Sequence, residues 1–117
     1  MSFYSDVYIA CEEEAYEKFK QVYTQHDFMP TSIRINQNTE YLLHWSWVKW
    51  YDDFPEVQAI TKEMKNLNDN EEDGVAYKFI KLNEDNTIET EANEQGWNIF
   101  ENTCGTVTID LGTFEED

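Results

Sequence analysis

Carboxylates are the residues of this sequence with the clearest chemical potential, and they are concentrated toward its C-terminal end. The chain has 117 residues, of which 25 are Asp or Glu and 8 are Lys or Arg, so its formal net charge is −17 at pH 7. Ten of the acidic residues follow Lys81, and no Lys or Arg does. Six of these acids fall in or near predicted strands and turns, namely Glu84, Asp85, Glu89, Glu91, Glu94 and Glu101.

The spacing of these acids suggests one particular kind of binding. Strand alternation places Glu89 and Glu91 on one face, roughly 6.6 Å apart at a rise of about 3.3 Å per residue, which is comparable with the spacing of backbone phosphates. Proteins bind nucleic acid with Lys and Arg side chains that neutralise phosphates, and a fixed array of carboxylates can occupy the same basic groove. The alternative is that the acids only solvate one face of an ordinary domain. The self-repulsion of so much unopposed charge opposes compaction, which favours a role directed at a partner.

No other group of residues forms a recognisable catalytic motif. Neither His26 nor His44 has the spacing to Cys or Asp that a zinc site or a catalytic triad uses. Cys11 precedes a predicted helix, but the acids at positions 12–14 would oppose its thiolate, and Cys104 in a predicted turn is no better placed. The four glycines are isolated from one another, so there is no phosphate-binding loop. We therefore expect no enzyme activity and no cofactor.

One acidic segment imitates the opening of a calcium-binding loop. Asp69, Glu71 and Asp73 precede Gly74, as the acids at positions 1, 3 and 5 of an EF-hand precede the glycine at position 6. The twelfth position should be a bidentate Glu, and here it is Ile80. The segment is therefore interpreted as an acidic turn, and no metal site is predicted.

Aromatic residues form a second candidate surface between residues 45 and 51. The cluster consists of Trp45, Trp47, Trp50 and Tyr51. Core packing is the first interpretation of such a cluster. Any exposed member would instead be an anchor at a protein interface, where Trp and Tyr are enriched. We take Trp47 and Trp50 as candidate anchors, with Asp52 and Asp53 as an acidic rim beside them.

Composition limits the setting in which the protein acts. Strong negative charge repels nucleic acid and anionic membranes, so direct binding to either is not expected. No window approaches the ~18 apolar residues of a membrane-spanning helix, and the N-terminus lacks a secretion signal. Two cysteines far apart in the chain do not suggest a disulfide framework. These features predict a soluble cytoplasmic protein.

Hydrophobic periodicity predicts the elements that must position these residues. A chain of this length forms a single domain. Period-two alternation predicts strands over residues 4–11, 31–36, 41–51 and 75–82, and helical spacing predicts helices over about 12–25 and from about 52 to 67. The strand over 41–51 is apolar on both faces, which favours a central position in the sheet.

The resulting order, βαββαβ, is that of the ferredoxin-like arrangement, an antiparallel sheet with both helices on one face. We predict an α+β fold with this core over residues 1–82. The remaining residues, 83–117, form an acidic β extension, with added strands predicted over 87–91 and 106–111.

The stretch YLLHWSWVKWYDDFPEVQAI, with the later YKFIKLNED, resembles small acidic proteins encoded in bacteriophages and prophages of Gram-positive bacteria. The resemblance covers about residues 4–91 and brings no assigned activity. It is similar in kind to phage inhibitors of host defence, many of which are acidic and mimic DNA. The resemblance therefore implies an anti-CRISPR or anti-restriction action in the cytoplasm of a host bacterial cell, with a basic, nucleic-acid-binding host protein as partner.

Three hypotheses follow from the sequence, and the third is a protein that binds a divalent cation or a small ligand through the turn from Asp69 to Asp73. In the first, the C-terminal acids dock in the DNA-binding cleft of a host defence or DNA-processing protein. In the second, the protein is a non-catalytic interaction module that binds a partner through its Trp and Tyr side chains.

Overall fold

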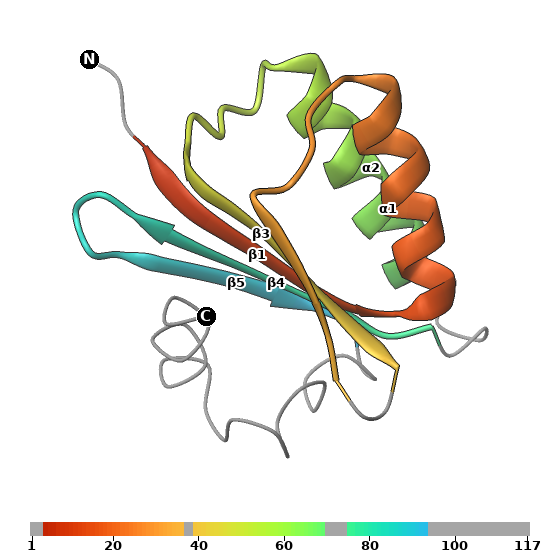
Figure 1. Cartoon of the computed structure of the whole chain (residues 1–117). Helices are drawn as coiled ribbons and strands as arrows, with labels where there is room; N and C mark the ends of the chain where they lie inside the picture. The colour runs from red at the N-terminus through yellow and green to blue at the C-terminus, as the bar shows by residue number, and fades with distance from the viewer. Residues whose placement is uncertain (1–3, 37–38, 70–74, 94–117) are drawn as a thin grey trace.

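The computed structural model describes residues 4–36, 39–69 and 75–93. Within these residues, two helices lie side by side over one face of a five-stranded antiparallel sheet (Figure 1). The elements are β1 (Ser5–Glu12), α1 (Glu13–Gln25), β2 (Ser32–Ile35), β3 (Glu40–Val48), α2 (Pro55–Asp69), β4 (Tyr77–Asn83) and β5 (Ile88–Ala92).

The strand order in the sheet is β2-β3-β1-β4-β5. The α+β class, the antiparallel sheet and the helices on one face are confirmed. The ferredoxin-like topology is not, because the chain order is βαββαββ and a fifth strand extends the sheet beyond β4. The fifth strand, β5, is the added strand predicted over 87–91, and a tight turn leads into it. The Asn83 backbone N–H donates to the Thr87 carbonyl, and Asn86 takes a left-handed conformation with φ 72° that Asn tolerates. The predicted strand over 106–111 lies outside the described residues.

Both helices begin where their sequences favour a helix start. Glu13 and Glu14 lie in the first turn of α1, where their charges interact favourably with the helix dipole. Pro55 occupies the first position of α2, which suits its fixed φ and missing N–H. Each helix buries one stripe at helical spacing, consisting of Ala15, Phe19 and Tyr23 in α1 and of Val57, Ile60, Met64 and Leu67 in α2.

The main core lies between the helices and the sheet. β1 contributes Val7, Ile9 and Cys11 to this core, as its alternation predicts, and each of them is fully buried. The opposite face of the sheet carries a second buried cluster, formed by Tyr8, Ala10, Leu42, Ala76 and Ile80. Because β1 is buried on both faces and paired on both sides, it is the central strand, and β3 is the interior strand next to it.

The alternation predicted for residues 41–51 fails after Trp45. Val7 pairs with Trp45 and Ser5 pairs with Val48, so β3 advances by three residues while β1 advances by two. This is a β-bulge, in which the extra residue breaks the alternation of faces. Trp47 lies in the bulge with a left-handed φ of 55°, and Val48, beyond it, packs against the main core. The strand therefore ends at Val48 and does not reach Tyr51.

Asn93 closes the sheet at the end of β5. Its side chain is 1% exposed, its carbonyl oxygen accepts the Tyr77 N–H at 3.1 Å, and its amide donates to the Val75 carbonyl at 2.5 Å. The Asn93 side chain thus gives a hydrogen-bond partner to two backbone groups next to the start of β4, the Tyr77 N–H and the Val75 carbonyl.

Replacing Asn93 with Ala is expected to lower the free energy of unfolding by about 2 kcal/mol, because an unsatisfied buried backbone group costs about 1–3 kcal/mol. Urea denaturation followed by circular dichroism measures the change. Thr90→Ala, at an exposed position of β5, serves as the control and should change stability by less than about 0.5 kcal/mol. Equal stability of the two variants would contradict this role of Asn93.

Candidate functional site

The β4–β5 hairpin presents four of the six predicted acids. Glu84 and Asp85 lie in its turn, and Glu89 and Glu91 lie on β5, and all four are exposed. β5 is the last strand of the described sheet, so the hairpin projects these acids from one side of the molecule (Figure 1). The other two predicted residues, Glu94 and Glu101, lie outside the described residues.

Glu89 and Glu91 share one face of β5, as the alternation predicts. Glu89 pairs with Lys81 and Glu91 pairs with Phe79. Phe79 belongs to the core beneath the helices, and directly paired residues of neighbouring strands lie on the same face. The two carboxylates therefore lie on the helix side of the sheet.

Hydrogen bonds hold two of the hairpin carboxylates in place. Asp85 accepts the Thr87 hydroxyl at 2.6 Å and the Thr87 N–H at 3.1 Å. Glu89 accepts the Asn83 amide at 2.8 Å and lies 3.3 Å from the Lys81 ammonium. The Thr87 hydroxyl lowers the pKa of Asp85, and the Asn83 amide, with Lys81, lowers the pKa of Glu89.

These lowered pKa values keep the hairpin charged and link it to folding. A carboxylate whose pKa is lower in the folded state stabilises the fold at pH values above its unfolded pKa. That contribution is lost as the pH falls through the folded pKa. At neutral pH, Asp85 and Glu89 are therefore ionised and oriented before any partner arrives.

A hydrogen bond from the core residue Tyr77 holds the Glu91 carboxylate in place. The Tyr77 hydroxyl donates to this carboxylate at 2.6 Å, although Glu91 itself is exposed. Burial raises the pKa of Tyr77, and the hydrogen bond to Glu91 raises it further. Tyr77 thus remains a hydrogen-bond donor, and Glu91 connects the buried core to the acidic surface.

The aromatic cluster divides between core and surface. Trp45 and Trp50 are 1% and 5% exposed, so the core interpretation holds for both, and Trp50 is not the exposed anchor that the sequence suggested. Trp50 lies beyond the end of β3, and its ring packs against those of Phe28, Trp45 and Phe79 in the core. Trp47 is 55% exposed, and Asp52 and Asp53 are exposed in the turn before α2.

Trp47 is held in a strained conformation. A left-handed residue with a side chain costs about 1–2 kcal/mol, and such strain is typical of functional sites. The backbone N–H of Trp47 donates to the Asp6 carboxylate at 3.2 Å, and the same carboxylate oxygen lies 3.2 Å from Nε2 of His44. The indole stacks on the Tyr4 ring, with centroids 5.4 Å apart. No glycine or turn signal marks this position, so the sequence alone does not reveal the strain.

The stacked pair of Trp47 and Tyr4 lies at the same end of the sheet as the hairpin turn. Ser5 pairs with Val48 on one side and with Asn83 on the other, and its hydroxyl donates to the Asn83 side chain at 2.9 Å. Val48 and Asn83 are therefore separated by two strand spacings, or about 10 Å, and Trp47 and Glu84 are their neighbours in the chain.

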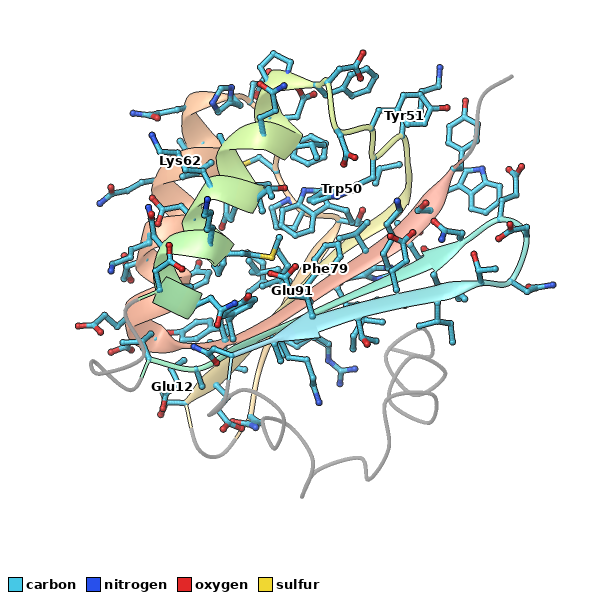
Figure 2. The ribbon with its side chains drawn as sticks, turned by 180° about the vertical axis from the view of Figure 1, so that it is seen from behind. Glu12, Trp50, Tyr51, Lys62, Phe79 and Glu91 are labelled. Atoms are coloured by element: carbon cyan, nitrogen blue, oxygen red, sulfur yellow. The ribbon has the colours of Figure 1, made fainter. Side chains whose placement is uncertain are left out.

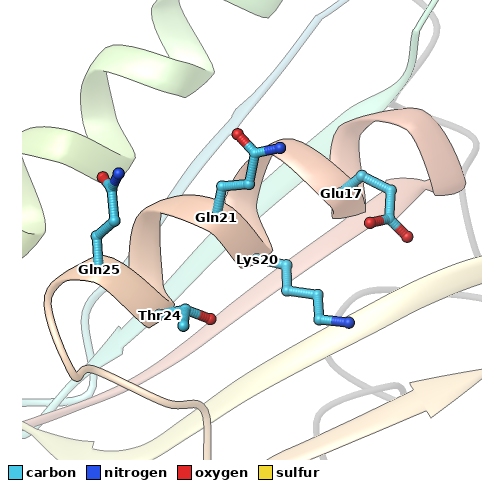
Figure 3. Close-up of a pocket in the computed structure, with 5 residues that line it drawn as sticks. All are labelled: Glu17, Lys20, Gln21, Thr24 and Gln25. Carbon is cyan, nitrogen blue, oxygen red and sulfur yellow. The ribbon is translucent and has the colours of Figure 1, made fainter.

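Two hollows in the surface differ in what lines them. An open depression of about 440 Å³ lies along α1. Figure 3 shows the side chains that line it, which are Glu17, Lys20, Gln21, Thr24 and Gln25. All of these side chains come from one helix and are exposed, and no aromatic or buried polar group joins them. A smaller cavity of about 160 Å³ lies between α2 and the hairpin, and it combines Trp50, Asp52, Phe79, Glu89 and Glu91.

The remaining sequence candidates show no reactive arrangement. Cys11 is buried, and burial together with the Glu12 charge raises the pKa of its thiol. Among the described residues, no three His, Cys, Asp or Glu side chains could hold a metal ion together, and no helix could span a membrane. Cys104 and residues 70–74 of the calcium-like segment lie outside the described residues.

Comparison of the chain with protein-family models, curated proteins and solved structures gave no match. The function must therefore be argued from the residues of this chain.

The low pKa of Asp85 should depend on the Thr87 hydroxyl. Thr87→Val removes that donor, so the pKa of Asp85 should rise toward its ordinary value of 3.8. Thr87→Ser keeps a hydroxyl and should leave the pKa low. A pH titration of the Asp85 carboxyl carbon by NMR measures both variants. The same pKa in both would show that the hydroxyl does not set it.

Strain at Trp47 should reverse the usual order of Gly and Ala. Trp47→Gly should be more stable than Trp47→Ala by about 1 kcal/mol, because only glycine takes a left-handed φ without penalty. At Thr90, in regular β5, Thr90→Gly should instead be less stable than Thr90→Ala by about 0.5–1 kcal/mol. Urea denaturation of the four variants gives both differences, and the same order at both positions would refute the strain.

Proposed function

We propose that this protein is a non-catalytic inhibitor that occupies the basic, nucleic-acid-binding cleft of a host protein in place of nucleic acid. The observation that carries the proposal is the exposed β4–β5 hairpin, with Glu84, Asp85, Glu89 and Glu91 on a single projecting element. A basic cleft binds such carboxylates through the same Lys and Arg side chains that bind phosphates.

The order of the hairpin carboxylates supports this function beyond their number. Asp85, Glu89 and Glu91 each accept a hydrogen bond from a neighbouring side chain. Groups that are already oriented lose less conformational entropy when they bind. Lys81 pairs with Glu89, but no Lys or Arg follows it in the sequence. The hairpin therefore keeps a net negative charge and contributes to the long-range attraction of a basic partner.

A second candidate surface contributes to the same interface. Trp47 is exposed, strained and stacked on Tyr4, which favours a protein-interaction module with an aromatic anchor. Because Trp47 lies at the same end of the sheet as Glu84 and Asp85, the two hypotheses describe neighbouring parts of one surface. An aromatic anchor beside charged groups is the usual anatomy of a protein interface.

The biological setting is part of the proposal. A phage or prophage origin, an anti-CRISPR or anti-restriction action and a cytoplasmic location in the host bacterium all agree with an acidic protein that competes with DNA. Under this proposal, the protein itself binds neither nucleic acid nor membrane. Its complex forms rapidly at low salt and weakens steeply as salt rises.

Affinity capture from a bacterial lysate, followed by competition, tests the proposal. The captured protein should be a nucleic-acid-binding protein that duplex DNA releases from the complex. Reversing the four hairpin charges (Glu84→Lys, Asp85→Lys, Glu89→Lys and Glu91→Lys) should weaken binding at least roughly tenfold, since exposed ion pairs contribute about 0.2–1 kcal/mol each. Biosensor measurements at two salt concentrations give the affinity and the association rate.

A variant of equal net charge provides the control. Reversal of Glu14, Glu17, Glu56 and Glu63 on the helices changes the total charge by the same amount and leaves the hairpin intact. This control should keep most of the affinity. Equal loss in the two variants would mean that only net charge matters, and a captured partner that DNA does not displace would refute mimicry. If Trp47→Ala weakens binding and the hairpin reversal does not, the aromatic module is the correct function.

A further inference from the structure

We propose that the cavity between α2 and the β4–β5 hairpin binds one cationic side chain of the partner, and that this side chain is an arginine. This inference rests on the proposed function and names what the helix-side face of the hairpin recognises. The cavity has a volume of about 160 Å³, while a water molecule takes about 30 Å³ in the liquid. It therefore has room for several waters or for a planar guanidinium group.

Aromatic side chains form the floor of the cavity. The rings of Trp50 and Phe79 lie 5.8 Å apart, and the two residues are 5% and 8% exposed. Figure 2 shows Trp50, Phe79 and Glu91 gathered between α2 and the hairpin. Aromatic faces attract cations, and the attraction strengthens where water is excluded. A floor of this kind suits an organic cation better than a hydrated metal ion.

Carboxylates approach the cavity from both sides. Glu89 and Glu91 reach it from β5, and Asp52 reaches it from the turn before α2. One base lies among them: Lys81, whose ammonium is 3.3 Å from Glu89. The lining of the cavity therefore carries excess negative charge. A basic partner complements that charge.

Guanidinium fits this combination better than ammonium does. Its plane stacks on aromatic rings, and its forked donors bind carboxylates in pairs. A carboxylate has two oxygens and can accept several hydrogen bonds, so Glu91 can accept from a ligand as well as from Tyr77. Lys81 competes for Glu89, and its charge opposes the incoming cation.

Titration of the full chain with ethylguanidinium chloride tests the inference without the partner. Proton–nitrogen NMR spectra at constant ionic strength should show saturable shifts at the Trp50 indole N–H and the Phe79 amide. The Gln21 amide, on the α1 depression, should not shift. Ethylammonium should bind more weakly, and sodium chloride should produce no saturable shift.

Single substitutions give effects of opposite sign. Asp52→Asn should weaken ethylguanidinium binding roughly two- to fivefold, as loss of one exposed ion pair does. Lys81→Gln should tighten binding by a similar factor, because it removes the competing cation. Glu14→Gln makes the same charge change as Asp52→Asn on a different part of the surface, and it should leave the affinity unchanged.

Three outcomes would overturn the inference. These are shifts without saturation, equal weakening by Asp52→Asn and Glu14→Gln, and saturation of the same signals by calcium chloride in preference to ethylguanidinium. None of them decides the proposed function, because capture of a DNA-binding partner depends on the whole hairpin. Conversely, a hairpin reversal that leaves partner capture intact would refute the function, even if ethylguanidinium binds.

Discussion

The pairing of β1 on both of its sides is the constraint on which the rest of the structure depends. Its residues bond to β3 on one side and to β4 on the other. Alternate side chains enter the core beneath the helices and the cluster on the opposite face. Its first residue, Ser5, sets the separation of Trp47 from the hairpin turn. The strand is early in the chain and its partners come much later, so the surface forms only when the whole sheet forms.

The carboxylates on β5 have two physical consequences: they discourage pairing with other chains, and they form an oriented acidic surface. Exposed strands at the side of a sheet can pair with other chains, and charged side chains discourage such pairing. Glu89 and Glu91 on β5 therefore have a protective role whether or not a partner binds. Protection alone would not require oriented carboxylates, yet Asn83, Thr87 and Tyr77 hold the acids of this hairpin in defined positions. These hydrogen bonds therefore agree with the proposed binding role of the hairpin better than with solvation alone.

Local patterns predicted most of the elements, and tertiary pairing decided what they could not. Periodicity placed β1, both helices and β5 within a few residues, because each side chain pattern reflects the face that its element buries. The bulge at Trp47 has no local signal, since the apolar alternation of β3 continues through it and only pairing with β1 reveals the extra residue. The sequence also did not predict the cavity between α2 and the hairpin. Asp52, Glu89 and Glu91 line it together only because α2 packs over the sheet. The predicted strand over 87–91 is β5, and it makes the sheet five-stranded, so the fold is not the classic ferredoxin topology.

Under the proposed function, the Trp47 indole and the hairpin carboxylates contribute to binding in different ways. Burying an exposed indole at an interface removes apolar surface from water, which mainly slows dissociation. Exposed carboxylates act at longer range and mainly accelerate association. The bulge places the indole on the surface, and the β1–β3 pairs together with Asp6 offset its backbone strain. The two groups lie on strands that flank β1, so one sheet presents both. Under the proposed function, a partner attracted by the hairpin would therefore meet the aromatic anchor on the same side of the molecule.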